Sequence, residues 1–129
     1  MADKELFNVM TYDYVSDSNI LDIPDTFTNI GTLTTGDNEA GLYEFVFSLA
    51  FIYSTTTSFA TFRWRIDGGT WTEFQVEPKD VNATNSKYYG YPGTYIAGVH
   101  VFEFEIKKGS SGNVLDVQFI DLMFKRVGL

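Results

Sequence analysis

The hydrophobic pattern is strongest in residues 42–53, LYEFVFSLAFIY, where both parities of an extended strand carry apolar side chains. Successive side chains of a strand point to opposite faces of its sheet, so this segment would present an apolar row on each face. One row contains Tyr43, Phe45, Phe47, Leu49, Phe51 and Tyr53, and the other contains Leu42, Val46, Ala50 and Ile52. A two-layer sandwich buries one face of each sheet. The pattern therefore predicts that one row needs a cover beyond a single copy of the chain, and a second copy is the natural one.

The rest of the chain predicts an all-β fold. Short runs of β-branched and aromatic residues alternate with Gly, Asn, Asp and Ser clusters, which is typical of a β-sandwich. The predicted strands are residues 7–15, 26–34, 41–54, 58–67, 70–77, 87–91, 94–107 and 113–127. Residues 16–25 are expected to form a loop with a short edge piece at 20–23. We expect one domain, an antiparallel β-sandwich of about eight strands over residues 26–129, preceded by an acidic arm or edge segment at residues 1–25.

Two hairpins fix the register of these strands. In TFRWRIDGGTWTEF, residues 61–74, apolar residues alternate with arginines, and Asp67-Gly68-Gly69 provides the positive φ angles of a tight turn. Residues 98–112 alternate aromatic and charged residues and end in the flexible turn KGSSG.

The last predicted strand changes phase. Its apolar residues are Leu115, Val117 and Phe119 at odd positions, then Ile120, Leu122 and Phe124 at even positions. Either a β-bulge near residues 119–120 turns the strand over, or both of its faces are covered.

Composition and charge narrow the class of protein. The 129 residues are enough for one core without staples, and there is no cysteine for a disulfide or a thiolate metal site. The start MADKELFN has no apolar signal region, and the longest apolar run is far shorter than the roughly 20 residues of a membrane helix. We therefore expect assembly in a cytosol and no membrane partner.

The net charge of −8 is concentrated before residue 51. No basic stripe is present for a phosphate backbone, so nucleic acid is not expected as a partner. The acidic third either docks on a basic surface or simply keeps an abundant protein soluble. Its acids Asp13, Asp17, Asp22 and Asp25 lack the spacing of a calcium loop, and solvation is the simpler interpretation.

No constellation points to catalysis. His100 is the only histidine and alternates in phase with Phe102 and Phe104, as a satisfied core or interface histidine does. Without a cysteine or a second histidine, the usual nucleophile–base pairs are absent. No metal motif or phosphate loop is found, so we expect no enzyme activity, no cofactor and no metal.

The segment YYGYPGTY, residues 88–95, is the candidate recognition loop. Its tyrosines are Tyr88, Tyr89, Tyr91 and Tyr95. Tyrosine gives a large, rigid, amphipathic contact, and glycine lets the backbone adapt. The loop would contact a neighbouring protein, pack on its own sandwich, or stack on a sugar.

The hairpin TFRWRIDGGTWTEFQVEPKD (61–80) and the closing strand NVLDVQFIDLMFKRVG (113–128) resemble small jelly-roll proteins of tailed-phage virions. The order of a central GLYEFVFSLAF strand, an Arg/Trp hairpin, a Tyr/Gly loop and this ending is similar too. The resemblance covers roughly residues 26–128 and is to the tumour-necrosis-factor/C1q type of sandwich, which phages use in capsid decoration (cement) proteins and at fibre tips. A shared fold does not by itself assign a function.

The resemblance implies a homo-oligomer, with a trimer favoured, whose aromatic inner sheet lines the three-fold axis. It suggests the following candidates for oligomer-interface or core packing: Tyr43, Phe45, Phe47, Phe51, Phe119 and Phe124.

Two functions follow as hypotheses. The first is a virion protein that clamps the major capsid protein and reinforces the shell. The alternative is a receptor- or glycan-binding head that uses the tyrosine loop.

Overall fold

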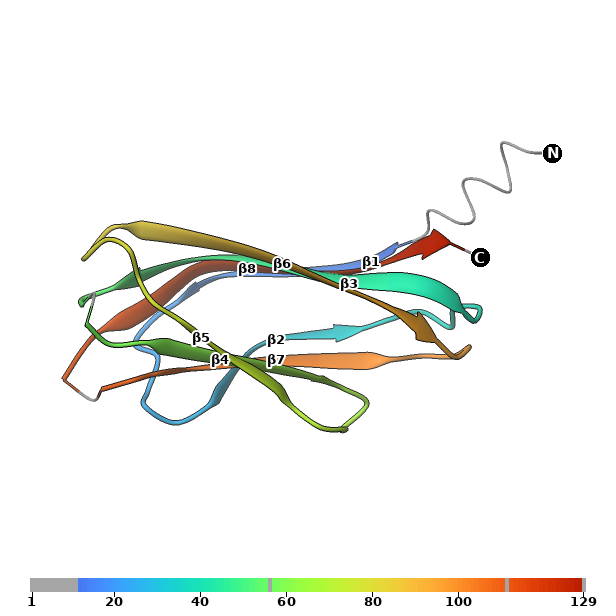
Figure 1. The fold of residues 1–129 in the computed structure, drawn as a ribbon, viewed down its shortest axis with the longest axis horizontal. Helices are drawn as coiled ribbons and strands as arrows, with labels where there is room; N and C mark the ends of the chain where they lie inside the picture. Colours follow the sequence, from blue (N-terminus) through green and yellow to red (C-terminus); the bar gives the residue numbers. More distant parts are fainter. Residues whose placement is uncertain (1–11, 56, 111, 129) are drawn as a thin grey trace.

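The computed structural model describes residues 12–55, 57–110 and 112–128, which form two antiparallel sheets packed face to face (Figure 1). The strands are β1 (Tyr12–Ile20), β2 (Thr28–Thr34), β3 (Gly41–Tyr53), β4 (Ala60–Ile66), β5 (Thr72–Val76), β6 (Thr84–Tyr95), β7 (Val101–Lys108) and β8 (Leu115–Gly128). The strand orders are β1-β8-β3-β6 in one sheet and β2-β7-β4-β5 in the other. This is the order of a jelly roll, so the predicted fold class is confirmed. The described part contains no helix that could cross a membrane.

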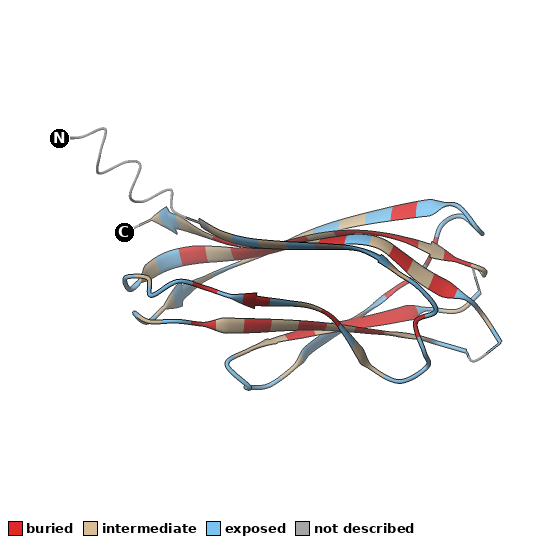
Figure 2. Cartoon of the chain, turned by 180° about the vertical axis from the view of Figure 1, so that it is seen from behind, coloured by how far each residue is buried: buried red, intermediate tan, exposed pale blue. Residues whose placement is uncertain are grey.

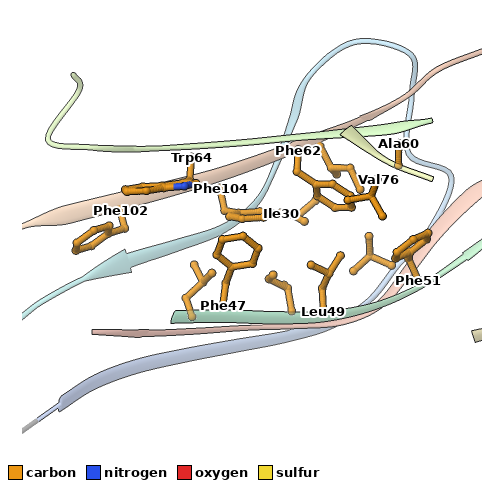
Figure 3. Close-up of a cluster of buried hydrophobic side chains, with 14 of the residues drawn as sticks. Ile30, Phe47, Leu49, Phe51, Ala60, Phe62, Trp64, Val76, Phe102 and Phe104 are labelled. Carbon is orange, nitrogen blue, oxygen red and sulfur yellow. The ribbon is translucent and has the colours of Figure 1, made fainter. Parts of the chain in front are cut away.

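The core lies between the two sheets and is dominated by rings. All six residues of the aromatic row of β3 face inward, and none of them is more than 3% exposed. Figure 3 shows Phe47, Leu49 and Phe51 reaching toward Phe62 and Phe104 of the opposite sheet. Facing rings approach closely, as in the Phe47–Phe104 pair with centroids 4.5 Å apart. The second sheet therefore covers the aromatic row within one chain.

The other row of β3 faces outward from the sandwich. Val46 is 5% exposed and Ala50 is 1% exposed; Met123 and Phe119 of β8 lie opposite them, and Tyr88 of β6 lies opposite Ser48 in the row between. Leu42, at the start of the strand, is 38% exposed. The expectation that one whole row lacks a cover is therefore wrong. What remains open is a narrower surface, formed by the flanking strands rather than by β3.

The phase change of β8 is a bulge. Ala50 pairs with Phe119 while Phe51 pairs with Val117, so Gln118 is the extra residue relative to β3. Strand β1 has a matching irregularity opposite Gln118. Asn19 has a φ of 55° there, between Ser18, which pairs with Phe119, and Ile20, which pairs with Val117. Because of the bulge, Val117 and Ile120 both point into the core and Phe119 points outward. Buried and less buried positions alternate along β7 and β8 (Figure 2).

Several predicted boundaries differ from the structure. Residues 16–20 continue β1 instead of beginning a loop, and the short strand predicted at 87–91 is part of the long edge strand β6, which continues through residues 92–95. The predicted strand at 94–107 begins only at Val101. The turn at Asp67 is as predicted, since Asp67 and Gly68 have positive φ and Gly69 donates to the carbonyl oxygen of Ile66. The part of the predicted arm before residue 12 lies outside the described residues.

Candidate functional site

The outer face of the β1-β8-β3-β6 sheet carries several large, exposed hydrophobic side chains on neighbouring strands. Cross-strand register aligns Tyr14 with Met123 and Val46, and four residues further along β3 it aligns Phe119 with Ala50. Tyr88 of β6 pairs with Ser48 in the row between them. We call Tyr14, Tyr88, Phe119 and Met123 the outer patch. Tyr14 is 52% exposed, Tyr88 66% and Phe119 39%.

The outer patch surrounds small side chains of β3. Val46, Ser48 and Ala50 lie between Met123 and Phe119 of β8 on one side and Tyr88 of β6 on the other. The patch is also partly polar, because the Tyr14 hydroxyl donates to Oδ1 of Asp121 at 3.0 Å. Such a surface suits packing against another protein surface.

Most of the tyrosines predicted as a recognition loop face the core. Tyr89 lies 4.9 Å from the ring of Phe74, and Tyr91 lies 5.0 Å from the ring of Trp64, centroid to centroid. Tyr95 packs edge-on against Phe124 at 4.9 Å, and its partial burial raises the pKa of its hydroxyl. Alternation along β6 leaves Tyr88 alone pointing outward. Residues 88–95 are therefore part of a strand rather than a loop, and a recognition role for Tyr88 stays a prediction.

The packing candidates fall into two groups. Tyr43, Phe45, Phe47, Phe51 and Phe124 are at most 3% exposed and lie in the core of the single chain. Phe119 is the exception, because the bulge turns it onto the outer patch. Tyr14 and Met123 were missed by sequence reasoning. Met123 alternates with Leu122 and Phe124 along the last strand, which was the available signal that it points the other way. Tyr14 can be placed on the same face only when its pairing with Met123 is known.

His100 is buried, and both of its ring nitrogens are hydrogen-bonded. Nδ1 lies 2.7 Å from Oδ2 of Asp67, and Nε2 lies 2.8 Å from the carbonyl oxygen of Ile96. Both partners are acceptors, so the ring satisfies them together only as an imidazolium that donates twice. Burial opposes this charge, but the hydrogen bonds to Asp67 and Ile96 outweigh it and raise the pKa of His100. The pair ties the β4–β5 turn to the loop before β7.

The acids suspected of holding an ion are not gathered. Among the described residues, no group of three His, Asp or Glu side chains could hold a metal. Asp13 instead accepts from the backbone of Gly36 and the side-chain amide of Asn38. The side chain of Asp17 is not described.

On the outer face of the other sheet, the arginines form ion pairs with glutamates of the same sheet. Arg63 and Arg65 bond Glu105 and Glu103 across β4 and β7, with Nε–Oε1 distances of 2.7 and 2.9 Å. The ring of Trp71 lies 4.1 Å from the Arg63 guanidinium carbon. These charges already have partners in the described chain, which leaves the outer patch as the better candidate site.

Comparisons with known proteins concern the fold. No protein-family model matches the sequence, and no curated protein matches it. The vertex protein P5 of PRD1 is similar over 91% of this chain and 73% of its own, with 10% identity and a TM-score of 0.53. The mosquito-larvicidal Cry4Aa toxin of Bacillus thuringiensis is similar over 83% of this chain, with 10% identity and a TM-score of 0.53, and this chain spans 20% of the toxin. Eiger TNF from S. frugiperda aligns over 90% of this chain and 86% of its own, with 12% identity and a TM-score of 0.48. The jelly-roll β-sandwich is thus a fold shared with viral and toxin proteins.

Proposed function

We propose that this chain is a non-enzymatic structural protein of a tailed-phage virion, which decorates the capsid shell and associates with copies of itself through the outer patch. The observation that carries the proposal is the set of exposed rings on the outer face of the β1-β8-β3-β6 sheet. A contiguous exposed apolar patch on a small protein commonly marks a contact surface.

The face is large enough for a specific contact. Four strands spaced about 4.8 Å, each with about ten residues of about 3.3 Å, give a face of about 600 Å². Stable interfaces bury about 800 Å² per partner, so this sheet face plus its flanking loops would suffice. A trimer is the expected assembly, following the resemblance to tumour-necrosis-factor-type virion proteins.

Two features support the virion assignment. The sequence resembles phage decoration proteins across the hairpin and the closing strand, and the PRD1 vertex protein has the same fold. In a decorated shell, repeated contacts add buried area at about 25 cal/mol per Å² of apolar surface, and several contacts per oligomer reinforce each other. We expect the major capsid protein to be the partner and the virion to be the location.

The alternative function, a receptor- or glycan-binding head, is less favoured by the arrangement of residues 88–95. It required the tyrosines of residues 88–95 to form a binding loop, and only Tyr88 remains outside. A glycan array separates the two functions. Strong binding to a sugar that disappears in Tyr88→Ala would contradict the decoration proposal.

Co-sedimentation with capsids tests the proposal directly. Purified capsids that lack this protein would be mixed with it and pelleted, first with wild type and then with Phe119→Ser/Tyr88→Ser. We expect wild type to pellet at a saturating ratio set by the number of capsomers and the double variant to remain in the supernatant. Ile96→Ser is the matched control, because Ile96 is 78% exposed but lies in the loop before β7. Wild type that stays in the supernatant at all concentrations would overturn the proposal.

A further inference from the structure

A groove runs along the open side of the sandwich, between the edge strands β1 and β2. Its volume is about 370 Å³, within the range of sites that bind ligands or peptide side chains. The floor is aliphatic, formed by Ile30, Ile120 and Leu122, all at most 2% exposed. The rim is polar but uncharged, with Ser16, Asn29 and Thr32. The lining holds no aromatic ring, so it lacks a stacking surface for a sugar.

Local backbone features create this groove. The register of β2 against β7 shifts between Asn29 and Gly31, so that a bulge turns Ile30 into the core. A Cβ at Gly31 would lie 3.1 Å from Cδ1 of Leu122, which is closer than ordinary packing allows. Glycine at this position therefore lets β2 approach the β8 side chains and leaves the space above them open.

The two strands beside the groove are edge strands. Each lies at the end of its sheet, so one side of its backbone lacks a strand partner among the described residues. Edge strands commonly carry Lys or Pro, which discourage the addition of another strand. On the opposite side of the sandwich, β6 contains Lys87 and Pro92, and β5 has only five residues. Neither β1 nor β2 contains a Lys or a Pro.

The ends of the groove are acidic. Asp13 lies near the start of β1, while Asp22 and Asp25 follow Ile20 in the connection to β2. In the described part of the chain, none of these three carboxylates forms a salt bridge with a Lys or Arg. An occupant with positive charge at its two ends would therefore be complementary to this surface.

We propose that the groove binds an extended segment of a partner protein, which adds as a strand to the free edge of β1. The segment has uncharged, branched aliphatic side chains at its centre and Lys or Arg at its ends. Backbone hydrogen bonds to β1 provide affinity, and the aliphatic floor selects the side chains that point inward. The groove and the outer patch share strand β1, since Val15 and Ser16 line the groove and Tyr14 belongs to the outer patch.

A synthetic peptide of sequence RTVTITVTR is the probe, titrated into isotope-labelled protein at low salt and followed by NMR. We expect shifts concentrated on the backbone of β1 and on Ile30, Ile120 and Leu122. A peptide with serine in place of Val and Ile should not bind. Shifts confined to other strands, or no binding by the probe, would overturn the proposal.

N-methylated peptides test the strand pairing itself. Methylation of every second amide removes the donors that face β1 in one peptide and those that face away in the other. We expect the first to bind at least about tenfold more weakly, because several net hydrogen bonds are lost, and the second to bind like the parent. Equal affinity for both peptides would show that no strand is added.

The charge contribution has its own variant and control. Asp22→Asn/Asp25→Asn should weaken binding of the probe about threefold, as expected for exposed ion pairs, and should reduce its salt dependence. Asp80→Asn removes an exposed acid from the β5–β6 connection and should leave the affinity unchanged. An equal effect of both variants would contradict the assignment of the acidic ends.

Discussion

At the scale of single residues, His100 is the side chain with the most constrained chemistry. Its ring donates to a carboxylate and to a backbone carbonyl, and its backbone N–H donates to Oγ1 of Thr35 at 2.9 Å. Asp67 in turn accepts from the N–H of Val101 at 2.7 Å. Partial burial opposes the charge of Asp67, but the bonds from His100 and Val101 lower its pKa. The charged pair therefore joins three connections at one end of the sandwich.

The directions of these pKa shifts predict a pH window for stability. The raised pKa of His100 gives stability that is complete below its ordinary value of 6.5 and is lost as the pH rises through the folded-state pKa. The lowered pKa of Asp67 gives stability that is complete above 3.8 and is lost as the pH falls through its folded-state value. We expect the contribution of this pair to the free energy of unfolding to be largest between pH 3.8 and 6.5. Urea unfolding at several pH values measures it.

Replacing Asp67 by asparagine isolates the charge of the pair. Asparagine tolerates the φ of 51° at this position, so the turn itself should survive. At pH 6 we expect Asp67→Asn to lower the free energy of unfolding by about 1 kcal/mol, a modest value because the Asp67 carboxylate is half exposed. At pH 9 the neutral imidazole can accept from the new amide, and the two proteins should be nearly equal. A loss that is the same at both pH values would contradict the imidazolium assignment.

Replacing two phenylalanines of the packing candidates by alanine should lower the free energy of unfolding by very different amounts. Phe47 is fully buried and contacts the rings of Phe45, Phe74 and Phe104, among others. Phe47→Ala should lower the free energy of unfolding by about 3–5 kcal/mol, which is a large share of the stability of a small domain. Phe119→Ala should cost less than about 1 kcal/mol in the dilute protein, because the ring lies on the outer patch. Denaturant unfolding of both variants at low concentration measures the difference, and similar losses would contradict the bulge.

At the scale of elements, the sequence indicated the change of phase in the last strand but not its solution. Alternation alone left two possibilities, a bulge or a strand covered on both faces. The structure has the bulge at Gln118, matched in β1 by Asn19. Asparagine is enriched at positive φ, which is the signal that would have favoured the bulge. This signal is hidden in the sequence because the polar residues of 16–25 favour a loop there.

The full length of the edge strand β6 could not be predicted from the sequence for a related reason. Gly90, Pro92 and Gly93 normally punctuate loops, and they outweighed the alternation of the tyrosines. Proline is compatible with an edge strand, because its missing N–H can face away from the ladder. Tyr89 and Tyr91 pair with Phe47 and Phe45 of β3, so packing of rings on the inner face outweighs the local turn preference.

Two glycines in one turn provide a matched test of the loop after β7. A Cβ at Gly109 would lie 2.5 Å from the carbonyl oxygen of Phe59, whereas no atom lies within 4 Å of a Cβ at Gly112. Gly109→Ala should lower the free energy of unfolding by about 1–3 kcal/mol through overpacking, and Gly112→Ala should be nearly neutral. The Gly109 amide also donates to the Tyr53 hydroxyl at 2.9 Å, which fixes the approach of this turn. Thermal unfolding of the pair tests the close approach, and equal midpoints would contradict it.

At the scale of the whole molecule, the two-layer jelly roll and its hairpins followed from alternation, but the coverage of β3 did not. Parity shows which residues share a face, and it does not show how much of a row neighbouring side chains will cover. Val46 and Ala50 are buried beside Met123 and Phe119 of β8, and the aromatic row is covered by the second sheet. The sandwich therefore completes its core within one chain. The self-association that we propose therefore depends on the exposed rings of Tyr14, Tyr88 and Phe119.

The most direct test of this account is the mass of the protein in solution across a dilution series, measured by light scattering. Wild type should approach three times the chain mass of 14.6 kDa at high concentration. Phe119→Ser/Tyr88→Ser should remain at one chain mass while keeping the unfolding midpoint of the isolated domain, and Ile96→Ser should behave as wild type. A wild-type protein that stays at one chain mass at every concentration, or a double variant that assembles as wild type does, would contradict self-association through the outer patch.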